Sequence, residues 1–166
     1  MMSPSATRAH PTRGQLRSAW AAFWCGLLFA LVNLYWTLGG TFALETVGGR
    51  LARAVVERNP AMMFVLAVTV LVKLGGALFA LALVQPWGSV FPRWLLLVCG
   101  WSGTAVLVGY GGVLVGAAAA LEIGVIPAPP EVDWTALRGH LYVWDMWFLI
   151  WGVLLGLAMV GFTRRR

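Results

Sequence analysis

One lysine stands in the middle of an apolar stretch and is the residue best placed to do chemistry. Lys73 is the only lysine among the twelve basic residues, and it lies in the run from Ala61 to Val84. It is about twelve residues into that run, which is ~18 Å along a helix and near the centre of a bilayer. A lysine there costs at least ~2.5–3.5 kcal/mol on insertion scales, so it is a functional candidate by default.

The carboxylate best placed to pair with Lys73 is Asp145, about one turn inside the last apolar run. Glu122 and Glu45 lie nearer the outer surface and are weaker candidates. An ion pair with Asp145, or an ammonium that snorkels toward the interface, would only hold the helices together. A polar functional site around Lys73 is the alternative, and the sequence leaves both open.

Other polar and aromatic residues fall at a similar depth, in the half of the membrane that we expect to face outward. Asn33 lies about 20 Å from the inner end of the first run, with two tyrosines at comparable or shallower depth. If these side chains face inward, they outline a small cavity open to the outside. The predicted ligand-binding residues are Asn33, Tyr35, Trp36, Lys73, Tyr110, Asp145, Trp147 and Trp151.

The sequence holds ten tryptophans, and several of them lie where apolar runs meet polar flanks, as in an interfacial belt. Trp144, Trp147 and Trp151 follow an i, i+3, i+7 spacing, so they share one face of a helix. Packing within the bundle is the simpler account of this stripe. A wall facing a ligand is the alternative, and it would place Trp147 and Trp151 beside the cavity.

Common catalytic and metal-binding motifs are missing from the sequence. The two cysteines, Cys25 and Cys99, have no C-x-x-C spacing, and the histidines are His10 and His140. There is no HExxH motif, no Gly-rich phosphate loop and no Ser/His/Asp set. We therefore predict no catalytic residue, no metal site and no cofactor, and we prefer a non-enzymatic role while leaving enzyme activity open.

The composition requires lipid as the solvent for much of the chain. Its 166 residues are 60% hydrophobic and only 11% charged, against about 25% charged in soluble domains. Four apolar runs are long enough to cross a ~30 Å hydrocarbon core as helices. The predicted fold is an all-α four-helix transmembrane bundle. Its spans are about 18–40, 61–84, 94–121 and 141–162, in one domain over 18–166 after a disordered cytoplasmic tail at 1–17.

The two loops on the outer side differ in pattern. Thr46 can cap a helix that starts near Val47, where an apolar stripe predicts a short interfacial helix between the first two spans. Asn59-Pro60 would end it, and an ordered loop explains the pattern equally well. The second loop, 122–140, is rich in proline and is expected to be partly extended.

The net charge of +6 does not indicate a nucleic-acid partner, because the arginines flank the apolar runs, where their positions indicate the orientation of the chain in the membrane. With the N-terminus inside, seven arginines lie on the cytoplasmic side and four outside, which favours a multi-pass plasma-membrane protein with both termini in the cytoplasm. The seven are Arg8, Arg13, Arg17, Arg93, Arg164, Arg165 and Arg166, and the four are Arg50, Arg53, Arg58 and Arg138.

Two segments resemble DUF3995, a family of small four-span membrane proteins of actinobacteria and other bacteria. Residues 33–40, NLYWTLGG, are similar to its His-x-Tyr-Trp-Ala-Leu-Gly-Gly motif, and residues 144–152, WDMWFLIWG, to its closing W-[DS]-P-W-F-L-x-x-G pattern. Asn33 stands where the family tends to have His, which counts against a metal or proton role there, and Met146 where it often has Pro. The family has no assigned activity, so the resemblance implies fold and topology. The motifs contain Tyr35, Trp36, Gly39, Gly40, Asp145 and Trp147.

Three functions are compatible with this pattern. The preferred one is a non-enzymatic protein that binds a membrane lipid or small amphiphile through its outer half, or that acts as a partner subunit. The alternatives are a small transporter or permease subunit, and a membrane enzyme or redox component acting on a lipid or quinone. The inner half is Leu, Val, Ala and Trp, which counts against a transport path through one chain. The GxxxG step at Gly112 and Gly116 predicts packing within the bundle or, alternatively, a homo-oligomer.

Overall fold

A computed structural model describes residues 10–165, and this part of the chain is helical with no strand. The predicted all-α membrane bundle is thereby confirmed. The elements are α1 (Arg13–Thr37), a 3-10 turn η1 (Leu44–Thr46), α2 (Gly49–Val56), α3 (Pro60–Ala82), a 3-10 turn η2 (Pro86–Val90), α4 (Arg93–Glu122), α5 (Trp134–Gly139), a π-helical turn η3 (His140–Trp144) and α6 (Asp145–Arg164).

Four helical stretches are long and apolar enough to cross a membrane, so the chain is a multi-pass membrane protein. The first begins at Arg13, inside the expected tail, because the Thr12 side chain accepts a hydrogen bond from the backbone of Gln15. The rest of that tail, residues 1–9, lies outside the described residues. The fourth stretch begins at Trp134, where Asp133 caps α5, and not at the expected Leu141.

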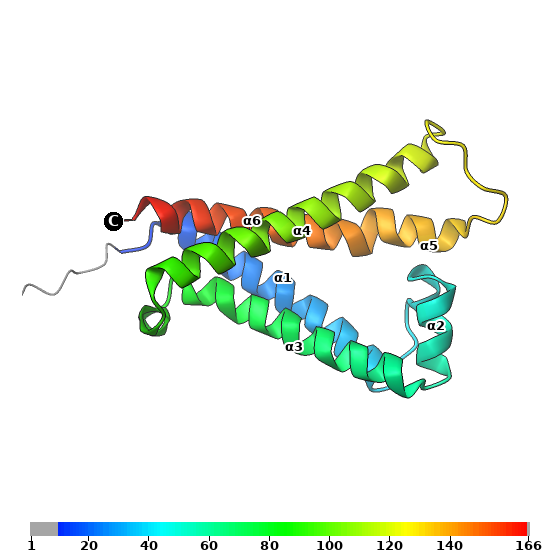
Figure 1. Ribbon diagram of the computed structural model, residues 1–166, viewed down its shortest axis with the longest axis horizontal. Helices are drawn as coiled ribbons and strands as arrows, with labels where there is room; N and C mark the ends of the chain where they lie inside the picture. Colours follow the sequence, from blue (N-terminus) through cyan, green and yellow to red (C-terminus); the bar gives the residue numbers. More distant parts are fainter. Residues whose placement is uncertain (1–9, 166) are drawn as a thin grey trace, which may run out of the picture.

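The four long helices form two pairs that separate toward one end of the molecule. α1 packs along α3 and along α6, and α4 packs along α6. α3 and α4 follow each other in the chain, yet these two helices make at most slight contact. Figure 1 shows the pairs diverging toward α2 and α5, at what we call the splayed end. The start of α1 and the C-terminus lie at the opposite end, the terminal end.

Glycines set how closely α4 and α6 approach each other. A Cβ on Gly111 would lie 2.6 Å from the backbone nitrogen of Leu149, and one on Gly152 would lie 2.8 Å from that of Val108. Small residues at such crossings let helices pack where lipid supplies no hydrophobic drive. The predicted packing of the GxxxG step within the bundle is wrong at Gly116, because a Cβ there would meet no atom within 4 Å in the described chain, and its alternative, a homo-oligomer, stays a prediction.

The terminal half of the bundle is filled by a buried tryptophan side chain, which we call the floor. The buried indole of Trp151 lies against Gly26 of α1 and Gly76 of α3, where added Cβ atoms would come within 2.5 and 3.0 Å of it. Next to the floor, four small or flexible side chains of α1 and α6 are completely buried. They are Ala19, Ala22, Ala158 and Met159.

The predicted helix between the first two spans is confirmed as α2, but its start is different. Gly48, at φ 104°, makes the turn into α2, while the Thr46 hydroxyl donates to the carbonyl of Ala43 within η1. Only glycine adopts that φ without strain, so the turn determines where the helix begins. Asn59 does not merely end α2, since its side chain accepts from the backbone of Met62 and caps α3.

Candidate functional site

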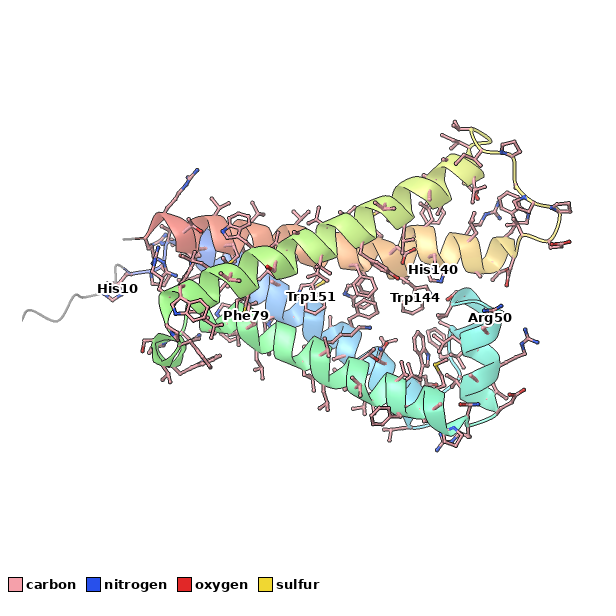
Figure 2. The ribbon with its side chains drawn as sticks, viewed as in Figure 1. His10, Arg50, Phe79, His140, Trp144 and Trp151 are labelled. Atoms are coloured by element: carbon pink, nitrogen blue, oxygen red, sulfur yellow. The ribbon has the colours of Figure 1, made fainter. Side chains whose placement is uncertain are left out.

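A chamber of about 320 Å³, lined by both apolar and polar side chains, lies in the splayed half, between the two helix pairs. Figure 2 shows Trp151, Trp144 and His140 in succession from the floor toward the splayed end. Aromatic rings form much of the wall, and polar groups reach it from several elements. The aromatic residues are Phe29, Trp36, Trp144 and Phe148, and the polar ones are Asn33, Thr69, Lys73, Tyr110, His140 and Asp145.

Lys73 is buried in this chamber, with 9% of its surface exposed. Its Nζ atom lies 3.3 Å from the centroid of the Phe29 ring and 5.4 Å from that of Phe148. Aromatic faces attract a cation, so these rings hold the ammonium in place. The predicted ion pair with Asp145 is wrong, because within residues 10–165 Lys73 makes no salt bridge. Glu122, the weaker candidate, pairs with Arg138 at 3.1 Å.

Asp145 pairs instead with His140, through the geometry of the π-helical turn. A π-helix brings residues five apart onto one side, and here the His140 Nδ1 atom lies 3.2 Å from the Asp145 Oδ2 atom. The His140 Nε2 atom lies 3.0 Å from the carbonyl oxygen of Val47. A carbonyl only accepts, so Nε2 must carry a proton.

The contact between Nδ1 and Oδ2 then needs one further proton, on either the His140 ring or the Asp145 carboxyl group. In both cases the pair is neutral as a unit. The ammonium of Lys73 is therefore not balanced by a carboxylate of the chamber.

We expect the His140–Asp145 contact to appear as an energetic coupling. In a double-mutant cycle of His140→Ala and Asp145→Ala, the losses in the free energy of unfolding should differ from additivity by about 1 kcal/mol, because either change alone breaks the same contact. The free energy is measured by titration with sodium dodecyl sulfate. Pairing Asp145→Ala with Glu122→Ala is the control and should be additive, since Glu122 contacts Arg138. Additivity in the first cycle would contradict the contact.

Asn33 and Tyr110 complete the polar lining. Asn33 is buried, and its side-chain amide donates to the Thr69 hydroxyl at 3.1 Å. Tyr110 reaches the chamber from α4, with its ring edge-on to Phe148 at 5.3 Å. Tyr110 is 53% exposed and so lies at the rim. The structure thus brings together five of the predicted residues, namely Asn33, Trp36, Lys73, Tyr110 and Asp145.

Tyr35, Trp147 and Trp151 lie outside the chamber. Tyr35 and Trp147 line a separate apolar groove of about 880 Å³ between α1 and η3, which also touches Trp36 and Trp144. The Trp36 and Trp144 rings meet at 5.1 Å and separate this groove from the chamber. The Trp147 indole donates to the carbonyl of Cys25 at 3.1 Å, and Trp151 forms the floor. The expectation that Trp147 and Trp151 wall the chamber is therefore wrong.

His140 is the main chamber residue that no sequence pattern indicated. Residues five apart point in different directions on an α-helix, so the spacing of His140 and Asp145 suggests no contact until the π-turn is known. Thr69, Phe29 and Phe148 were missed for a related reason. They sit inside uniformly apolar helices, whose periodicity does not tell a chamber-facing side from a lipid-facing one.

The fold and the site define a multi-pass α-helical membrane protein with a polar, aromatic-walled chamber in one half of its bundle. The family comparison gives a match to DUF3995, described as a protein of unknown function, over residues 26–155. The chain belongs to that family, as its two motifs suggested. The first motif supplies Asn33 and Trp36 to the chamber, and the second supplies Trp144, Asp145 and Phe148. Searches of curated proteins and of solved structures found no match.

Proposed function

We propose that the chamber binds the polar end of an anionic membrane amphiphile, with Lys73 as the anchoring charge. The observation that carries this proposal is the buried side chain of Lys73, whose Nζ atom has aromatic neighbours but no carboxylate within salt-bridge distance among the described residues. Charges inside a membrane are costly unless paired, and an anionic ligand would supply the missing partner. The His140–Asp145 pair is neutral as a unit and so does not compete for that role.

The size and lining of the chamber favour a polar head over a whole phospholipid. Its volume of about 320 Å³ is at the lower end of ligand pockets, which run from about 300 to 1,000 Å³. Asn33 and Tyr110 offer hydrogen-bonding groups in the chamber that holds Lys73, and four aromatic rings offer apolar contact. Such a mixture suits a small head group attached to hydrocarbon.

A transport role finds less support in the single chain. The floor of Trp151, Gly26 and Gly76 closes the terminal half, and the residues next to it are alanine and methionine. A transport path would need polar groups that continue past this plug. Binding needs only the chamber, so it is the function that we propose.

Binding of a brominated fatty acid tests the proposal. Bromine quenches tryptophan fluorescence, and Trp36 and Trp144 lie in the chamber wall. Protein in mild detergent should be quenched saturably by dibrominated stearate, but not by its uncharged methyl ester. Lys73→Met should weaken binding of the acid at least about tenfold, which corresponds to about 1.4 kcal/mol.

The matched control is Arg50→Met, which removes an exposed positive charge on α2 outside the chamber. It should leave quenching by the acid unchanged. Equal binding of the acid and the ester, or equal binding by the wild type and Lys73→Met, would refute Lys73 as the anchor.

We also propose a location and an orientation. The chain would form one domain in a plasma membrane, with both termini in the cytoplasm and the splayed end facing outward. The distribution of arginines supports this, because basic residues favour the cytoplasmic side. α1 and α4 begin and α6 ends at the terminal end, and the arginines there are Arg13, Arg17, Arg93, Arg164 and Arg165. α2, the turn after it and α5 lie at the splayed end, and their arginines are Arg50, Arg53, Arg58 and Arg138.

A further inference from the structure

The chamber has one side that no helix contact closes. α1 packs against α3 and α6, and α6 packs against α4, but α3 and α4 make at most slight contact. Figure 1 shows these two helices separating from η2 toward the splayed end. The chamber is lined from α3 by several residues, including Val65 and Lys73, and from α4 by Tyr110. Its open side is therefore the lateral gap between α3 and α4.

The rim residues show that this gap reaches the surface of the molecule. Val65 and Tyr110 both line the chamber, yet they are 51% and 53% exposed. Both lie within membrane-spanning helices, and Tyr110 is about 18 Å along α4 from Glu122 at 1.5 Å per residue. At the depth of Tyr110 the surrounding solvent is hydrocarbon and not water.

The other sides of the chamber are bridged within the described residues. The Trp36 and Trp144 rings form one wall, and each indole N–H donates to the loop after α1, to Phe42 and Thr46 respectively. Toward the splayed end, the His140 ring contacts the Val47 carbonyl. The Trp151 floor closes the bottom.

We infer that the ligand is a single-chain amphiphile that enters sideways from the bilayer, with its hydrocarbon chain lying in the gap rimmed by Val65 and Tyr110. This inference rests on the proposed function, which places the acidic head at Lys73. The acidic head then lies beside the basic side chain of Lys73, and the hydrocarbon chain lies in the neighbouring apolar gap. The ammonium faces the chamber at one end of the route, and apolar side chains lead outward to the lipid.

Photo-crosslinking of palmitic acid tests the route of the chain. The probe carries a diazirine in the middle of its chain, and the wild-type protein is reconstituted in phosphatidylcholine nanodiscs. Mass spectrometry of the labelled peptides locates the chain. We expect saturable labelling of α3 and α4 around Val65 and Tyr110, and not of Leu31 and Val143, which line the separate apolar groove. Lys73→Met should abolish the saturable part.

A matched pair of variants tests the gap directly. Val65→Trp places a bulky ring at the rim and should reduce saturable labelling at least about fivefold. Val72→Trp makes the same change about two turns along the same face of α3, at a residue that is 67% exposed and does not line the chamber. It should leave the labelling unchanged.

The outcomes separate the two proposals. Labelling that depends on Lys73 but falls on Leu31 and Val143 would overturn the lateral route and leave head-group binding intact. Equal effects of Val65→Trp and Val72→Trp would do the same. Labelling that does not saturate and ignores Lys73→Met would refute head-group binding, and the lateral route would fall with it.

Discussion

Gly111→Leu is expected to lower the free energy of unfolding by about 3 kcal/mol or more, because it forces α4 away from α6. A Cβ at this position would lie 2.6 Å from the backbone nitrogen of Leu149 and 3.0 Å from the backbone oxygen of Asp145. Backbone atoms cannot rotate out of the way as a side chain can, so the helices themselves must move. The displacement would also disturb Asp145, and with it the chamber.

Gly109→Leu is the matched control for this change. It alters the same helix two positions away, where a Cβ would meet no atom within 4 Å in the described chain. Leucine is also a better helix former than glycine, so no loss of stability is expected. Both variants are unfolded with sodium dodecyl sulfate and followed by tryptophan fluorescence. Equal stability of the two would contradict the close crossing of α4 and α6.

The second large effect has the opposite sign. Lys73→Met is expected to raise the free energy of unfolding of the ligand-free protein by about 1–2 kcal/mol. A central lysine costs ~2.5–3.5 kcal/mol, and a cation–π contact of the kind made with Phe29 returns about 0.5–2 kcal/mol. Methionine fills a similar space without the charge. Because Lys73 makes no salt bridge within residues 10–165, its removal leaves no carboxylate without a partner.

The sign of this change distinguishes the observed arrangement from an ion pair. If Lys73 and Asp145 were paired, removal of either would leave a buried charge and cost about 3–5 kcal/mol. Instead, Lys73→Met should stabilise and Asp145→Ala should destabilise, because Asp145 contacts His140. Unfolding titrations of both variants, without added ligand, compare the signs. A loss of about 3–5 kcal/mol in Lys73→Met would contradict the unpaired arrangement and favour an ion pair.

The membrane spans could be predicted because few backbone conformations are stable in lipid. In hydrocarbon every backbone group must find an internal partner, so an apolar run of sufficient length becomes a helix. The family match agrees with the layout inferred from the two motifs. The start of the fourth span could not be placed, because the cap at Asp133 and the π-turn after it depend on local geometry.

The chamber was only partly predictable, since depth along a helix is simpler to infer than direction around it. Counting residues placed Asn33, Lys73 and Asp145 at compatible depths, and all three line the chamber. The direction in which a side chain points depends on how the helices cross. For this reason Trp147 and Trp151 lie outside the chamber although their depth was compatible with it. The π-turn also changes the direction of the side chains before α6, so that Asp145 contacts His140.

If the chamber binds an amphiphile as proposed, the floor decides which leaflet of the membrane supplies it. Because Trp151 closes the terminal half against Gly26 and Gly76, an amphiphile whose head reaches Lys73 through the lateral gap must come from the leaflet on the splayed side. The fraction of chambers that hold an amphiphile would then depend on the lipid composition of that leaflet alone. Moving an acidic lipid from one leaflet to the other would fill or empty the chamber, although the total lipid content of the membrane stayed the same.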